Sequence, residues 1–137
     1  MKIAKEFKWE MGHRLTFHEG LCRNLHGHSY KMMVEVEGEP DPDGMVLDYY
    51  NLAKIINPII AELDHGYMVY SKDEKLIDFM NEFESKHVIV NFEATAENMC
   101  GYFLEKIKEA ELPKNISRVT VLVYETEDCF AQDTIEL

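Results

Sequence analysis

The chain of 137 residues has little cysteine, little positive charge and no long apolar run. Its three cysteines, Cys22, Cys100 and Cys129, are too few and too scattered for a disulfide framework. No run approaches the ~18 apolar residues of a membrane span. The first residues alternate charged and apolar side chains and form no signal peptide. We therefore expect a soluble, reduced, cytoplasmic protein.

Basic residues are outnumbered, because 14 Lys and Arg stand against 26 Asp and Glu and the formal net charge is −12. Nucleic-acid-binding proteins present a basic face and anionic membranes attract basic segments, so the charge argues against both partners. It does not exclude an anionic small molecule, since a few cations or a metal ion can dominate one pocket. Arg14, Arg23 and Lys31 are candidates for such a local cationic patch.

The composition is otherwise that of a folded domain, with 46% hydrophobic and 29% charged residues. No repeat, linker or low-complexity segment divides the chain, so residues 1–137 are predicted to form one domain. Alternation of apolar and polar residues predicts strands at 3–13, 28–37, 117–125 and 130–136.

Apolar residues at helical spacing predict two helices between these strands. One covers 49–63, where Pro58 predicts a kink or a break. The other covers about 96–110, with Thr95 as its N-cap. Residues 72–84 and 87–92 give weaker indications of a short helix and a short strand. Two β-hairpins with two helices between them form an α+β, antiparallel pattern.

Three of the six histidines fall where two predicted strands meet. His26 and His28 are two residues apart on a strand, so they project from the same face. If the first two strands pair as a hairpin closed by residues 14–25, His13 faces both. Gly27 would leave room between the two rings. Three imidazoles and one open position form the arrangement of a catalytic zinc site.

A His-x-His pair alone is common on solvent-exposed strands, so the third histidine is what favours a metal site here. His18 and His87 have no such placement and are interpreted as surface or loop residues.

Cys22 lies in the predicted loop, four residues before His26. The nearby Arg14 and Arg23, and a zinc ion, would favour its thiolate and so a role as general base or nucleophile. A fourth zinc ligand and a small buried residue are the alternatives. Cys100 falls on the apolar stripe of a helix and is predicted to lie in the core.

Five further polar residues have a structural interpretation, and three of them also have a functional one. Asp64-His65 would suit a general acid/base pair, but it also suits the end of a helix. Glu125, at a strand end, could accept two hydrogen bonds from a cyclic guanidine edge such as a pterin presents. Thr95 and Glu97 suit helix capping.

These residues match an enzyme family in order and spacing. The chain resembles the family of 6-pyruvoyl-tetrahydropterin synthase and 6-carboxytetrahydropterin synthase, with Cys-x3-His-Gly-His as its most specific motif. The resemblance covers most of the chain. The matching segments are 12–15, 22–30, 44–49, 63–65, 95–98 and 123–126.

The resemblance implies a T-fold, an antiparallel four-stranded sheet with two helices on one face. It implies that the sheets of several subunits join into a barrel, usually in a homohexamer built as a dimer of trimers. It implies zinc on the three histidines, Cys22 as general base, and a second acid/base pair supplied by a neighbouring subunit. The implied residues are His13, His26 and His28 for zinc, Cys22, Asp64 and His65 for catalysis, and Glu125, Thr95 and Glu97 for the pterin.

The three residues between Cys22 and His26 resemble the carboxytetrahydropterin branch, whereas the pyruvoyl branch usually has five. The implied zinc-dependent lyase converts 7,8-dihydroneopterin triphosphate to 6-carboxy-5,6,7,8-tetrahydropterin, acetaldehyde and triphosphate, towards queuosine. A pyruvoyl-type synthase and a non-catalytic pterin-binding oligomer are the alternatives. The chain departs from the family at Ala94, where proline is usual, and in the longer segment 67–93.

Overall fold

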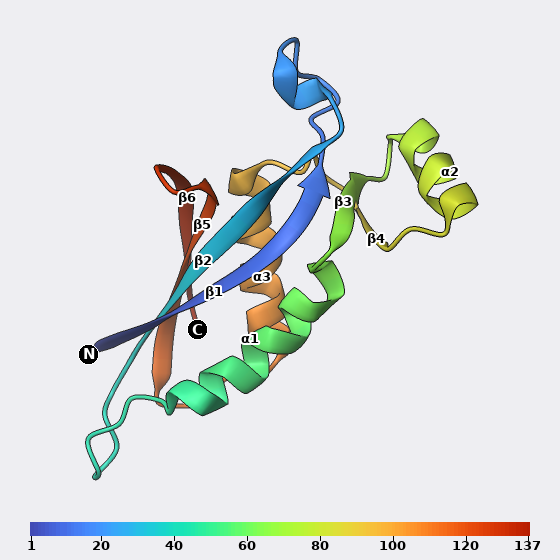
Figure 1. The fold of residues 1–137 in the computed structure, drawn as a ribbon. Helices are drawn as coiled ribbons and strands as arrows, with labels where there is room; N and C mark the ends of the chain where they lie inside the picture. Colours follow the sequence, from blue (N-terminus) through green and yellow to red (C-terminus); the bar gives the residue numbers. More distant parts are fainter.

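A computed structural model describes residues 1–137 as one curled sheet with three helices (Figure 1). The six strands lie in the order β4-β3-β1-β2-β5-β6. The strands are β1 (Lys2–His13), β2 (His26–Gly38), β3 (Gly66–Tyr70), β4 (His87–Val90), β5 (Ile116–Thr126) and β6 (Cys129–Glu136). The helices are α1 (Tyr49–Leu63), α2 (Glu74–Phe83) and α3 (Ala96–Glu109).

The long hairpin of β1 and β2 forms as its alternating sequence predicts. The register runs without interruption from Lys2 opposite Glu37 to His13 opposite His26. Phe7 and Trp9, which share one parity in β1, are buried in the main core. The hairpin therefore brings the predicted metal ligands to one end of a buried sheet face.

Helices α1 and α3 contribute their apolar stripes to the core on this face. Helix α1 continues through Pro58 without the break that proline suggested. Pro58 is exposed, so water can reach the carbonyl that it leaves without a donor. Helix α3 begins as predicted, because the Thr95 hydroxyl accepts the N–H of Asn98 at 3.2 Å.

The α+β prediction is confirmed, but the sheet is mixed and has two more strands than the four expected. Strand β3 pairs in parallel with both β1 and β4. The sequence of β3 gave no signal because a short strand covered on both faces shows no apolar–polar alternation. The weaker indications for α2 and β4 are confirmed, and α2 adds a third helix.

Helix α2 packs on the opposite sheet face from α1 and α3. Met68 of β3 belongs to the main core, whereas its neighbour Val69 packs with Leu76 and Met80 in a small second cluster. Successive strand residues point to opposite faces, so the two clusters lie on the two sides of the sheet.

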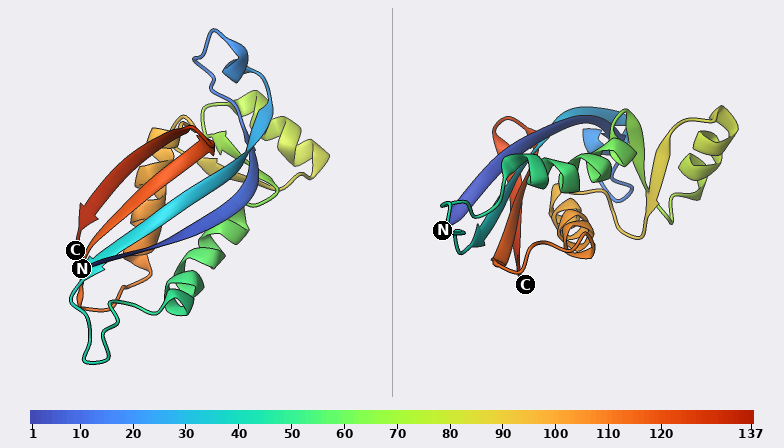
Figure 2. Two further views of the ribbon diagram at one scale, coloured as in Figure 1. Left: turned by 60° about the vertical axis from the view of Figure 1, so that its left-hand side comes forward. Right: turned by 90° about the horizontal axis from the view of Figure 1, so that it is seen from below.

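Figure 2 shows that the sheet is strongly curved rather than flat, and β4 and β6 form its two edges. This half-barrel shape leaves the outer edges of β4 and β6 unpaired within one chain. Such edges are the places where a sheet can continue into another subunit. Separately, none of the helices combines the length and the apolar character that a membrane crossing requires.

Candidate metal centre and active site

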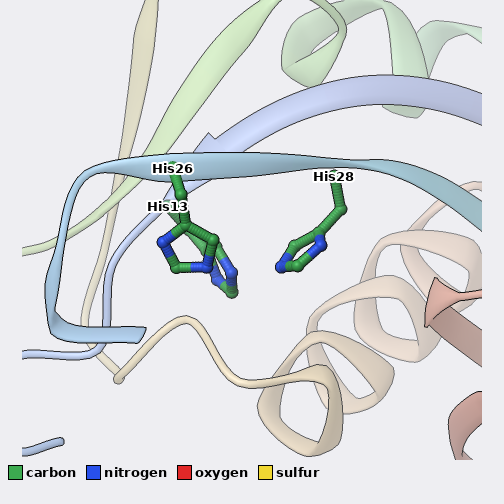
Figure 3. Close-up of side chains that lie close together, drawn as sticks. All are labelled: His13, His26 and His28. Carbon is green, nitrogen blue, oxygen red and sulfur yellow. The ribbon is translucent and has the colours of Figure 1, made fainter. Parts of the chain in front are cut away.

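The closed end of the β1–β2 hairpin carries three histidines on one face (Figure 3). The ring centroid of His13 lies 4.7 Å from that of His26 and 5.1 Å from that of His28. The centroids of His26 and His28 are 5.0 Å apart. One ligand nitrogen from each ring lies within 4.8 Å of the other two. The predicted cluster is confirmed as a group able to hold a metal ion.

Main-chain carbonyls fix the tautomers of two of these rings. His13 Nδ1 lies 2.7 Å from the carbonyl oxygen of Ala94, and His26 Nδ1 lies 2.7 Å from that of Asn24. A carbonyl oxygen only accepts, so each Nδ1 donates and each neutral ring keeps its lone pair on Nε2. His13 Nε2 is buried without a hydrogen-bond partner. A buried, unpaired lone pair with its tautomer fixed fits a metal ligand.

Burial keeps the histidines in the form that binds metals. It lowers the pKa of His13 to about 4, against the opposing hydrogen bond to Ala94 and with help from His26 and His28. Burial also lowers the pKa of His28, and the neighbouring His26 lowers it further. His13 and His28 are therefore neutral at pH 7, and neutral imidazole favours transition metals over magnesium or calcium.

Two glycines allow close approach of the strands beside the cluster. A Cβ at Gly27 would lie 2.7 Å from the carbonyl oxygen of Met11, and one at Gly12 would lie 2.3 Å from Cζ of Tyr67. Both positions alternate with the histidines and so point to the other sheet face. Gly27 makes room for the backbone of β1, and the expectation that it separates the imidazole rings is wrong.

The face that carries the cluster continues into a pair of buried aromatic rings. Tyr30 stacks on Trp9 at a centroid distance of 5.2 Å and lies 5.5 Å from the ring of His28. The Tyr30 hydroxyl and Trp9 Nε1 are buried without hydrogen-bond partners. Buried polar atoms are normally paired, so two such atoms beside the histidines are unusual. Tyr30 shares the strand parity of His26 and His28, and the sequence alone indicated no role for it beyond the strand.

Glu125 lies close enough to His26 to interact with it electrostatically, and Glu97 lies close enough to interact with Glu125. Burial raises the pKa of the half-buried Glu125. The carboxylate of Glu97 raises it further, whereas His26 lowers it. Thr95 immediately precedes α3, and its hydroxyl is occupied as the N-cap. The structure thus brings the three predicted substrate residues to the region around the histidines, but their contacts with a substrate stay a prediction.

The side chains of Asp64 and His65 meet directly after α1, with His65 Nδ1 3.0 Å from Oδ1 of Asp64. The same oxygen accepts the N–H of Glu10 at 2.9 Å, and the His65 N–H donates to the Glu10 carbonyl at 2.7 Å. The hydrogen bond from Glu10 lowers the pKa of Asp64, and His65 contributes. The two side chains therefore meet, as an acid/base pair requires, and they also end the helix.

Within one chain, this pair and the histidine cluster lie on opposite faces of the hairpin. His65 borders a hollow of about 440 Å³ that His26 and His28 also line, and Glu10, Gly12 and Ser29 are among its other strand residues. These strand positions alternate with the histidines. By this alternation His65 lies across the strands from the three imidazole rings, although His26 and His28 border the same hollow.

Cys22 is half-buried in a short 3-10 turn, Leu21–Arg23, of the 14–25 loop. Its sulfur does not belong to the group of atoms that could share a metal ion, so the fourth-ligand alternative has no support. Arg14 was expected to add positive charge beside the thiol. It instead binds Asp73, with Nε 2.6 Å and Nη2 3.0 Å from the carboxylate oxygens.

The remaining candidates behave as structural or surface residues. Cys100 is buried as predicted, and burial raises the pKa of its thiol to about 11. Cys129 is exposed. His18 and His87 lie outside the metal-ligand group. Lys31 places Nζ 4.2 Å from the centroid of the Tyr124 ring, so it does not join Arg14 in a cationic patch.

A curled sheet with its two long helices, α1 and α3, on one face and three convergent histidines in its long hairpin defines an enzyme of the T-fold class. The family model described as 6-pyruvoyl tetrahydropterin synthase matches residues 2–135, and the chain belongs to this family.

Relatives and solved structures agree with this assignment. A 6-carboxy-5,6,7,8-tetrahydropterin synthase from Haemophilus influenzae is 32% identical, with 96% of each chain covered. The Aquifex aeolicus protein of the same name is 30% identical, with 91% of this chain and 92% of the relative covered. The 6-pyruvoyl tetrahydropterin synthase of Plasmodium vivax superposes with a TM-score of 0.81 at 18% identity, over 100% of this chain and 98% of the other. That likeness confirms the T-fold.

Proposed function

We propose that the chain is a zinc-dependent 6-carboxy-5,6,7,8-tetrahydropterin synthase. It would convert 7,8-dihydroneopterin triphosphate and water into the carboxytetrahydropterin, acetaldehyde and triphosphate, on the way to queuosine and other deazapurines. The observation that carries this proposal is a cluster of three histidines, two with fixed tautomers, in a chain that matches carboxytetrahydropterin synthases over more than nine-tenths of its length.

His13, His26 and His28 would hold the zinc ion. Bound zinc supplies a Lewis acid that stabilises negative charge on oxygen atoms of the substrate side chain. The carbonyls of Ala94 and Asn24 hold two of the rings in the ligating tautomer, so little reorganisation accompanies binding. Three protein ligands leave one position for substrate, as in catalytic sites.

Cys22 would act as general base on the substrate side chain. Asp64 and His65 would form the second acid/base group, contributed by a neighbouring subunit. The Asp64 carboxylate would accept a hydrogen bond from the N–H at His65 Nδ1. This leaves His65 Nε2 to take up or release a proton. Two groups from different subunits can work on opposite sides of the substrate.

Glu125 would anchor the pterin ring, with Thr95 and Glu97 beside it. A carboxylate can accept two parallel N–H hydrogen bonds from the cyclic guanidine edge of a pterin. Partial burial of Glu125 would strengthen these bonds by excluding water.

The active enzyme would be a cytoplasmic homohexamer, a dimer of trimers. The half-barrel shape and the two unpaired sheet edges support assembly through the sheet. The three free cysteines fit a reducing compartment.

Product analysis tests the proposal. Zinc-loaded protein is incubated with 7,8-dihydroneopterin triphosphate, and pterin and acetaldehyde are identified by mass spectrometry. Carboxytetrahydropterin with released acetaldehyde is expected. Cys22→Ala should lose turnover while keeping its zinc content, and Cys129→Ala, a change at an exposed thiol, serves as the matched control.

Two other outcomes would contradict the proposal in different ways. A pyruvoyl product would assign the chain to the branch named by its solved structural neighbours. No product from any dihydropterin, with tight pterin binding that Cys22→Ala leaves unchanged, would indicate a binding protein.

A further inference from the structure

The loop that carries Cys22 has little apolar anchoring. Three of its large apolar side chains are exposed, Phe17 by 62%, Leu21 by 85% and Leu25 by 50%. Side chains that stay in water contribute no hydrophobic stabilisation to the position of a loop. Polar contacts therefore hold much of the loop, and the Leu15 N–H donates directly to the Cys22 carbonyl at 2.9 Å.

Arg14 makes the most extensive of these contacts. Its Nε and Nη2 donate to the two carboxylate oxygens of Asp73 at 2.6 and 3.0 Å, and the Asp73 side chain is only 5% exposed. Its Nη1 donates to the Arg23 carbonyl at 3.2 Å. The fork of Arg14 thus connects a buried carboxylate to the residue directly after Cys22.

A second carboxylate holds the same loop. Glu93 accepts the N–H of Thr16 at 3.0 Å on one oxygen and the Thr16 hydroxyl on the other. Asp73 and Glu93 are the two ends of one segment, which contains α2 and β4. The Cys22 loop is therefore held from both ends of the segment 73–93.

This segment is itself anchored to the sheet. Leu76 and Met80 of α2 pack on Val69 of β3, on the face opposite the main core. Contacts thus run from the sheet through α2 to Asp73, then through Arg14 to the main chain beside Cys22.

We propose that segment 73–93 positions Cys22 for catalysis and that Arg14, through its fork to Asp73 and Arg23, is the principal positioning residue. The proposal rests on the proposed role of Cys22 as general base. It also assigns a structural role to most of the long segment 67–93.

The test compares thiol reactivity and turnover. Arg14→Met alone would leave Asp73 buried without a partner, so the main variant is the double substitution R14M/D73N. In a Cys129→Ser background, the alkylation rate of Cys22 by iodoacetamide is followed on its tryptic peptide. We expect that rate to change by about fivefold or more, and kcat to fall by about 10–100-fold with little change in KM.

Matched variants separate positioning from a general loss of structure. Arg118→Met removes another arginine with two carboxylate partners, at 2.6 and 3.2 Å, and should leave both readouts unchanged. Arg14→Lys keeps the charge without the fork and should give intermediate values. If the double variant does not fold, Thr16→Val, which removes one hydroxyl contact with Glu93, should change both readouts in the same direction by a smaller factor.

A folded double variant with wild-type alkylation rate would overturn the proposal, whatever its turnover. Alkylation requires no substrate, so it is independent of the proposed reaction. If the wild-type protein formed no pterin product, the proposed function would fail and the alkylation contrast would still decide whether Arg14 positions Cys22.

Discussion

The histidine cluster and the Cys22 loop are neighbours in sequence, yet they are stabilised in different ways. His13 is 1% exposed and belongs to a hairpin whose inner face lies in the main core. The loop that follows it exposes its apolar side chains and depends on a few ionic and polar contacts. The three histidines thus share the stability of the long hairpin, whereas the thiol can be displaced by local changes.

Mutations in the two regions should therefore have different effects. A change at His13 should affect folding together with the proposed metal binding, because this side chain is buried. A change in the loop affects turnover with little effect on the free energy of unfolding, since little apolar surface is buried there.

The largest effect is expected from His13→Ala. It removes a ligand together with the hydrogen bond to the Ala94 carbonyl. Zinc affinity should fall by more than about 100-fold, because even the loss of groups that support a ligand costs 10–100-fold. Zinc content after dialysis measures this, with His18→Ala as the matched control outside the cluster. Full zinc content in His13→Ala would remove the basis for the metal centre.

The metal-free protein should lose stability in acid through the same residue. The pKa of His13 is about 4 in the folded chain against the ordinary 6.5. Between these values the unfolded chain binds a proton that the folded chain does not. The free energy of unfolding is therefore unaffected by this titration above pH 6.5. As the pH falls from 6.5 towards 4, it decreases by roughly 3 kcal/mol.

Urea unfolding of chelator-treated protein at several pH values measures that loss. His26 and His28 face the same ring, and Glu125 lies nearby with a raised pKa that has the opposite effect. The difference between wild type and His13→Gln at each pH isolates His13. Parallel curves for the two proteins would contradict the prediction.

A smaller effect of opposite sign is expected from Tyr30→Phe. The Tyr30 hydroxyl is buried without a hydrogen-bond partner, so its removal relieves an uncompensated desolvation. The free energy of unfolding should stay equal or rise by up to about 1 kcal/mol. Tyr50→Phe, at a side chain that is 81% exposed, is the control and should change nothing. A clear loss of stability in Tyr30→Phe would mean that the hydroxyl is paired.

The smallest effect is expected from Leu21→Ser on the loop. This residue is largely exposed, so the free energy of unfolding should change by less than about 0.5 kcal/mol. Met32→Ala, at a fully buried position of β2, should cost about 2–5 kcal/mol in the same assay. Equal losses in the free energy of unfolding for the two substitutions would contradict the conclusion that the hairpin and the loop are stabilised in different ways.

The long elements were accessible from sequence because each carries a full periodic pattern. Strands β1 and β2 alternate over their lengths, and α3 combines an apolar stripe with the Thr95 cap. Strand β3 has five residues, and only its pairing with β1 and β4 makes it a strand. Short parallel strands depend on partners distant in sequence, which no local pattern reveals.

The same distinction applies to the site. His13, His26 and His28 were predictable because one hairpin with a fixed register brings them together. The contacts of Arg14 with Asp73 and of Thr16 with Glu93 join residues 59 and 77 positions apart. Nothing in the sequence relates these pairs, since their meeting depends on how α2 docks on the sheet.

The acceptor that orients His13 is the main-chain oxygen of Ala94. Every amino acid carries that oxygen, proline included, so the identity of residue 94 can drift while the imidazole keeps its tautomer. This chain has alanine at that position. Because the acceptor is a main-chain atom, substitutions at position 94 do not remove it. The lining of the site can therefore change one residue at a time while the proposed metal ligand keeps its orientation.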